Sequence, residues 1–186
     1  MNFKKIIFLN FFILIFMACA SKSPKVFMFQ NIKNKEKVVL LPLKNNSKNI
    51  AAGRIIYRIL LSDLIKSERF EPIEEGEVRN FMQKNMLYPG DIPNYNQLSI
   101  LKSITKADIL IGGDVLDAGN INGDVKITLI LWARDINNGK LLWTTYYVKR
   151  GDDYRKIFHF GKVYSIGELS LKMIDDIVKS WEREGG

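Results

Sequence analysis

Cysteine and histidine are almost missing from this chain of 186 residues, which has one of each, Cys19 and His159. A single cysteine excludes a disulfide bond within the chain. One histidine and one cysteine also exclude the usual ligand sets of a zinc site. His159 stands between Phe158 and Phe160, a setting more typical of a packed structural histidine than of a catalytic base or a metal ligand.

Motifs that hold phosphates or cations are also missing. The order Ile111-Gly112-Gly113-Asp114 has neither the GxGxxG pattern nor the Lys-Ser/Thr pair of a phosphate-binding loop. Four aspartates gather around this segment, but their spacing matches no calcium-binding loop, so we predict that they are solvated. They are Asp108, Asp114, Asp117 and Asp124. We therefore predict no metal, no cofactor and no enzymatic activity.

Acidic residues are fewer than basic ones, and the formal charge is +8. Without Lys4 and Lys5 the chain has 28 − 2 = 26 basic and 20 acidic residues, a charge of +6. The basic residues are dispersed, with no dense run and no stripe interleaved with aromatics, so we predict no binding of nucleic acid. The charge favours solubility, with some attraction to anionic headgroups.

The amino terminus differs from the rest of the chain. Lys4 and Lys5 precede the apolar stretch 6–17, which Asn10 alone interrupts, and small residues follow it. This order is typical of a signal peptide, predicted here over residues 1–18. The apolar stretch is shorter than the roughly 20 residues that a membrane-spanning helix needs.

Cys19 stands where such a signal would be cleaved. The order Phe16-Met17-Ala18-Cys19 resembles a bacterial lipobox, although Phe16 takes the place where leucine is usual. The resemblance implies that the thiol carries a diacylglyceryl group and that Cys19 becomes the mature amino terminus. Each buried methylene contributes about 0.8 kcal/mol, so more than one acyl chain makes attachment effectively permanent. We predict a lipoprotein of the cell envelope, held on the outer membrane and facing the periplasm.

Residues 19–36 are predicted to form the lipidated end and a short tether, polar apart from 26–29. The seventeen residues 20–36 reach at most about 55 to 60 Å when fully extended. A single globular domain is predicted over residues 37–184, and the tether keeps it near its membrane.

The spacing of apolar residues predicts an α+β domain. Helices are predicted at 49–66, 75–86, 96–106 and 165–181, and strands or extended pieces at 37–43, 69–73, 107–116, 124–136 and 140–150. These elements indicate a mixed sheet of about four to five strands flanked by helices. The last strands carry large apolar groups on both faces, so we expect helices to cover much of both.

The turn between the last two predicted strands gives a candidate binding cluster. If Asn138-Gly139 is a two-residue turn, Arg134 lies opposite Trp143, and four large side chains of the two strands share one face of the sheet. The candidate partner-binding residues are Trp132, Arg134, Trp143 and Tyr147. Arg134 would then stack on Trp143. The alternative, which we favour for this pattern, is a core layer with an arginine whose head reaches solvent.

Two segments carry a resemblance to a known family. Residues 106–115 read KADILIGGDV and residues 133–143 read ARDINNGKLLW. Both segments occur within the order of strands and helices predicted above. This order resembles the periplasmic domain shared by the CsgG family, LpoB and the amino-terminal domain of TolB, over about residues 37–183. The resemblance implies an anticodon-binding-domain-like α/β sandwich that is not an enzyme and works through contacts with envelope proteins.

The resemblance leaves several functions open. We predict a binding or assembly module of the envelope. A CsgG-like secretion pore, which is a homo-oligomer, would need an extra pair of membrane strands of about 9 to 11 residues each, but the sheet already uses the long strands. An LpoB-like activator of a peptidoglycan synthase would need a longer linker than 20–36. An enzyme acting on envelope glycans would need a pair of carboxylates, and none stands at a credible spacing.

Overall fold

The computed structural model describes residues 25–28, 36–156 and 160–184. The predicted signal peptide, Cys19 and His159 therefore lie outside the described residues. The strands are β1 (Lys25–Met28), β2 (Glu36–Leu40), β3 (Lys44–Asn45), β4 (Phe70–Pro72), β5 (Ile109–Ile121), β6 (Asp124–Asp135) and β7 (Leu141–Arg150). The helices are α2 (Ala52–Lys66), α3 (Glu75–Lys84), α4 (Tyr95–Thr105) and α5 (Ile166–Glu184), with a 3₁₀ turn η1 at Gly151–Tyr154.

The strands form one mixed sheet in the order β1-β7-β6-β5-β2-β4, with β3 also paired to β5. The pairs β1–β7, β7–β6 and β6–β5 are antiparallel. The pairs β5–β2, β2–β4 and β5–β3 are parallel. The prediction of an α+β fold with a mixed sheet and flanking helices is confirmed, and three of the seven strands are short.

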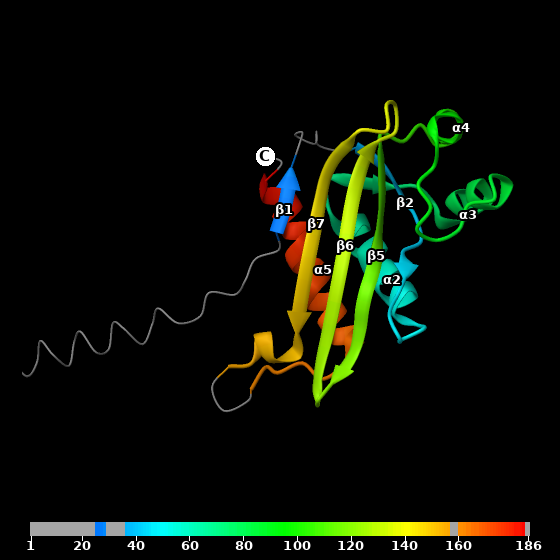
Figure 1. Cartoon of the computed structure of the whole chain (residues 1–186). Helices are drawn as coiled ribbons and strands as arrows, with labels where there is room; N and C mark the ends of the chain where they lie inside the picture. The colour runs from blue at the N-terminus through cyan, green and yellow to red at the C-terminus, as the bar shows by residue number, and fades with distance from the viewer. Residues whose placement is uncertain (1–24, 29–35, 157–159, 185–186) are drawn as a thin grey trace, which may run out of the picture.

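Helices α2 and α5 cover one face of the sheet, and α3 and α4 lie beside β2 on the other (Figure 1). The larger core lies under α2 and α5. Its fully buried side chains include Ile56, Leu60, Leu64, Ile127, Leu131, Trp143, Met173, Ile177 and Trp181. The smaller core lies under α3 and α4 and includes Val39, Leu41, Phe81, Leu98, Leu101, Leu110 and Trp132.

Helix α5 is amphipathic as predicted. Leu169, Met173, Ile177 and Trp181 recur every four residues, and all four are completely buried. The Trp181 ring packs on Trp143 of β7 with 4.0 Å between ring centroids. These contacts fix α5 along the centre of the sheet.

The hairpin between β5 and β6 is longer than predicted. The strand predicted at 107–116 continues as β5 to Ile121, and only Asn122 and Gly123 form the turn. Both residues have positive φ angles, 53° and 80°, as a tight type I′ hairpin requires. Glycine at the second position adopts this conformation without steric cost.

Part of the predicted tether belongs to the sheet. Residues 25–28 form β1, which pairs with Trp143 to Tyr146 of β7. The apolar run 26–28 is compatible with such a strand, but its partner lies more than a hundred residues further along the chain, so no local pattern indicates the pairing. The domain therefore begins before residue 37.

Candidate functional site

The predicted cluster of four residues does not share one face, because the register between β6 and β7 differs by one residue from the expected one. Trp143 lies opposite Ala133 rather than Arg134, and Tyr147 lies opposite Leu129. A one-residue shift moves a side chain to the other face of a sheet. Trp132 and Arg134 therefore lie on the face of α3 and α4, and Trp143 and Tyr147 on the face of α5.

The physical reason for the shift is the turn. Residues 136–140 connect the strands, with Asp135 N donating to Lys140 O at 2.9 Å and a register irregularity beside Arg134. The Asp135 carboxylate accepts hydrogen bonds from the Asn137 backbone N–H at 2.7 Å and from Asn138 Nδ2 at 2.9 Å. Gly139 takes the positive φ angle of 69°. The turn is thus longer than the two residues Asn138-Gly139.

Trp132 and Arg134 do interact with each other. The Arg134 guanidinium carbon lies 5.6 Å from the Trp132 ring centroid, and Arg134 Nη1 donates to Gly139 O at 2.8 Å. The Trp132 ring covers Gly112 on β5, where a Cβ would collide with ring carbons. The arginine stack was expected on Trp143 and is instead on Trp132. Partner binding by Trp132 and Arg134 stays a prediction.

Tyr147 and Trp143 lie in the larger core, with 3% and 0% of their surfaces exposed. Tyr147 Oη donates to Asp176 Oδ2 at 2.9 Å, and Tyr154 Oη donates to the same oxygen at 3.2 Å. Burial and then the bond to Asp176 raise the pKa of Tyr147 far above its ordinary value, so its hydroxyl remains a donor. This cluster joins β7, η1 and α5. The sequence did not indicate it, since Tyr154 and Asp176 lie in separate elements.

Lysine side chains surround the two tyrosines. Lys149 Nζ lies 5.0 Å from the Tyr154 ring centroid and 5.6 Å from that of Tyr147. Lys172 of α5 places its Nζ 5.0 Å from the centroid of the Tyr154 ring. Because Lys149 is almost completely buried, its contacts with the two rings contribute to the stability of the fold. The arrangement holds the carboxyl end of β7 against α5.

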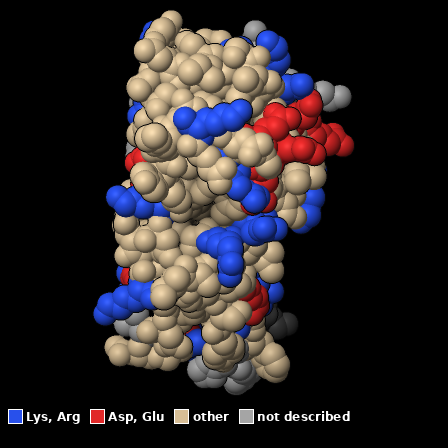
Figure 2. Space-filling view, turned by 90° about the vertical axis from the view of Figure 1, so that its right-hand side faces the viewer, with Lys and Arg blue, Asp and Glu red and all other residues tan. Residues whose placement is uncertain are grey.

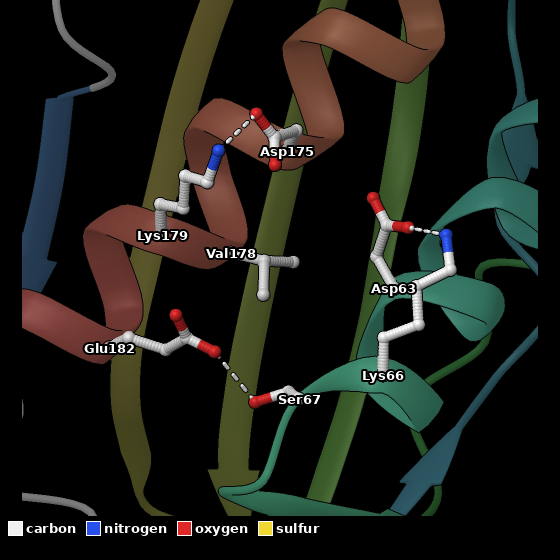
Figure 3. A pocket seen from close by; sticks show the side chains of 7 residues that line it. All are labelled: Asp63, Lys66, Ser67, Asp175, Val178, Lys179 and Glu182. Atoms are coloured by element: carbon white, nitrogen blue, oxygen red, sulfur yellow. Dashed lines mark hydrogen bonds and ion pairs between the residues drawn. The ribbon is translucent and has the colours of Figure 1, made fainter.

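A cleft of about 210 Å³ opens between the end of α2 and α5 (Figure 3). Its lining residues are Asp63, Lys66, Ser67, Asp175, Val178, Lys179 and Glu182. Figure 3 shows that their polar groups are paired with one another rather than aimed together at the centre.

Ion pairs and a hydrogen bond join the polar groups that line the cleft. Lys66 Nζ lies 2.9 Å from Asp63 Oδ1 on the same helix. Lys179 Nζ lies 2.8 Å from Asp175 Oδ2, and this hydrogen bond raises the pKa of Lys179. Across the cleft, Ser67 Oγ donates to Glu182 Oε1 at 2.8 Å. The polar groups of the cleft are thus paired with one another between the two helices.

In residues 25–28, 36–156 and 160–184, no three His, Cys, Asp or Glu side chains lie close enough together to hold a metal ion. Within the same ranges, no helix has the length and apolar character that crossing a membrane requires.

Comparison with known proteins finds no matching family model and no curated relative by sequence. Solved structures do match. PelC, a dodecamer from Paraburkholderia phytofirmans, is 12% identical, with a TM-score of 0.59 over 86% of this chain and 96% of its own. Lipoprotein GNA1162 from Neisseria meningitidis is 14% identical, with a TM-score of 0.56 over 80% of this chain and 99% of its own.

The carboxyl-terminal domain of LpoB from Salmonella enterica also matches, at 13% identity. Its TM-score is 0.50 over 63% of this chain and 84% of its own. At such identities the likeness concerns the fold. The resemblance to LpoB predicted from the sequence is thereby confirmed for the fold, which this chain shares with the LpoB domain, GNA1162 and PelC.

Proposed function

We propose that this protein is a lipoprotein of the bacterial cell envelope, anchored through Cys19 and acting without catalysis as a binding or assembly module. The observation that carries the proposal is the fold shared with lipoprotein GNA1162 over 80% of the chain. The lipobox-like order Phe16-Met17-Ala18-Cys19 supports the anchor. The internally paired polar groups of the cleft between α2 and α5 support a role without catalysis.

The position of β1 sets how close such an anchor would hold the domain. Lys25, the first residue of β1, follows Cys19 by six residues. Six residues span at most about 20 to 22 Å. With β1 paired to β7, the β1 edge of the sheet lies close to the anchoring membrane. We take this membrane to be the outer membrane, with the domain in the periplasm.

Metabolic labelling with radioactive palmitate tests the anchor. Cells producing the full chain should yield a labelled protein in the membrane fraction, and Cys19→Ala should abolish the label. Ser21→Ala, which leaves the thiol in place, serves as the matched control and should keep it. Equal labelling of the Cys19→Ala chain, or no label on the original chain, would count against the proposal.

A second candidate is self-assembly, because the solved PelC structure is a dodecamer. A free surface for it lies on the sheet, where half-exposed Tyr146 and Val148 of β7 face away from α5. Helices cover one face as expected, whereas α3 and α4 cover only the part of the other face beside β2 (Figure 1). Sedimentation velocity tests self-assembly, because a ring should sediment with a mass that is a multiple of the chain mass. A species with the mass of one chain would exclude self-assembly.

A further inference from the structure

Exposed apolar side chains are concentrated in one stretch of the chain. Fourteen large apolar or aromatic residues are exposed among the described residues, and six of them fall between positions 86 and 104. They are Met86, Tyr88, Ile92, Tyr95, Ile100 and Ile104, with exposed fractions from 47% to 85%. We call these six residues the α3–α4 apolar surface. Concentrated exposed apolar side chains of this kind mark interaction sites in soluble proteins.

The backbone beneath this surface is well bonded. Leu87 N donates to Met82 O at 2.9 Å, and Tyr88 N donates to the Asp91 carboxylate at 2.8 Å. Asn94 and Gln97 form a reciprocal capping box at the start of α4. A partner that covers the apolar side chains would therefore bind with a small entropic cost for ordering the loop.

Helix α4 has apolar residues on two sides. Leu98 and Leu101 face the smaller core and are almost completely buried. Ile100 and Ile104, four residues apart, lie on the outer side and are about half exposed. Residues four apart are neighbours on a helix surface, so they present one continuous apolar strip. The fold itself uses only the inner side of α4.

Lysines border this surface. Lys84 ends α3 two residues before Met86, Lys106 follows Ile104 by two residues, and the side chain of Lys44 lies against Gly90. None of the three makes an ion pair with another described residue, whereas Lys102 is paired with Asp108 at 2.7 Å. In Figure 2, which faces the side of the molecule where α3 and α4 lie, a broad tan surface is bordered by Lys and Arg side chains and, on its right, by a group of Asp and Glu side chains.

Two acidic groups near the surface have partners in the fold, whereas Glu74 and Glu77 stand at the opposite end of α3 from Lys84. The Asp91 carboxylate accepts the Tyr88 backbone N–H, and Asp108 binds Lys102. An apolar centre with unpaired lysines around it is complementary to an apolar segment that carries carboxylates.

The position of the anchor separates a protein partner from a membrane. Strand β1 lies at one edge of the sheet, whereas α3 and α4 pack beside β2, four strands away. At about 4.8 Å per strand the separation is about 19 Å. On the proposed function, the tether of six residues joins the domain at the β1 edge, and the α3–α4 apolar surface lies toward the opposite edge of the sheet (Figure 1).

We propose that the α3–α4 apolar surface binds an acidic amphipathic segment of another envelope protein. The apolar side chains of that segment contact Ile100 and Ile104, and its carboxylates face Lys44, Lys84 and Lys106. This proposal rests on the proposed function for the orientation of the domain and adds the binding surface and the chemistry of the partner.

Photo-crosslinking in the producing cells tests it. A benzoylphenylalanine in place of Ile104 of the full chain should crosslink to one segment of another exported protein. Sequencing of the crosslinked peptide should show apolar residues at helical spacing among Asp and Glu. A crosslink to a second copy of this chain, to lipid or to a basic segment would overturn the proposal, as would the absence of any crosslink.

Matched variants separate charge from folding. The double change Lys84→Glu and Lys106→Glu should lower the crosslink yield about tenfold, or about 1.4 kcal/mol in binding. Arg54→Glu, at an exposed site on α2, should leave the yield unchanged, and unaltered thermal melting should show that both variants fold. An equal loss in both variants, or a loss in neither, would overturn the charge complementarity.

A crosslinker at Ile65 of α2, which is 64% exposed against 53% for Ile104, should not give the same product. Palmitate labelling of the same sample keeps the two proposals distinguishable. A specific crosslink without label would contradict the lipid anchor alone, whereas label without a crosslink would contradict the binding surface alone.

Discussion

The two faces of the sheet differ in how they use apolar side chains. Under α2 and α5, residues such as Trp143, Met173 and Trp181 are completely buried, and the helices have few large apolar residues facing solvent. Under α3 and α4 the core is smaller, and α4 keeps Ile100 and Ile104 outside it. The first face holds most of the buried core, whereas the second leaves apolar side chains exposed, which the proposed partner would cover.

The largest effect on stability is expected from Trp181→Ala. The change removes a completely buried ring that packs on Trp143 at 4.0 Å, so we expect a loss of about 3 to 5 kcal/mol in the free energy of unfolding. Urea denaturation measures it. Leu171→Ala, at an exposed position of the same helix, is the control and should change stability by less than about 0.5 kcal/mol. Similar losses in both would show that α5 is not held by its buried face.

A smaller loss is expected from Gly112→Ala on the other face. The added Cβ would stand about 2.6 Å from Trp132 Cη2, so the ring must shift, at a cost of about 1 to 3 kcal/mol. Gly119→Ala on the same strand meets nothing within 4 Å and should be nearly neutral. Thermal unfolding compares the two variants. Equal stability would contradict the close packing of Trp132 on β5.

The tyrosine cluster should contribute less again. Tyr147→Phe removes the hydrogen bond to Asp176, while Tyr154 keeps its own bond to the same oxygen. We expect a loss of about 1 kcal/mol in the free energy of unfolding. Tyr164→Phe, at an exposed position, should have no measurable effect. If both variants unfold at the same urea concentration, the cluster does not stabilise the fold.

The smallest expected effect is a pH dependence. Burial raises the pKa of Tyr57 to about 12, against an ordinary value of 10.0. The stability that follows from a neutral Tyr57 is complete below pH 10 and is lost as the pH rises toward 12. At pH 10.5 the loss should be less than about 1 kcal/mol. Urea denaturation of the original chain and of Tyr57→Phe at pH 8 and 10.5 measures it, and parallel changes would contradict the raised pKa.

Helix α5 shows what the sequence predicts well. The four residues Leu169, Met173, Ile177 and Trp181 recur at helical spacing, and one helix of this period buries all of them. Local periodicity is sufficient here because a helix is built from neighbours in the chain.

Contacts between distant segments were not predictable in the same way. Strand β1 pairs with a strand more than a hundred residues away, and Tyr154 meets Asp176 only because η1 folds back on α5. The register error at Arg134 came from the turn, whose length depends on the hydrogen bonds of Asp135. The Asp135 side chain and Gly139 were the available signals for a longer turn.

Cys19 connects the sequence to the proposed function, and the intact mass of the mature protein tests that link most directly. We predict a mass that lacks residues 1–18 and includes a diacylglyceryl group on Cys19, with further acylation of its amino group. Fragmentation should place the lipid on the amino-terminal residue. A mature chain that begins elsewhere, or a Cys19 thiol free to react with iodoacetamide, would contradict the account.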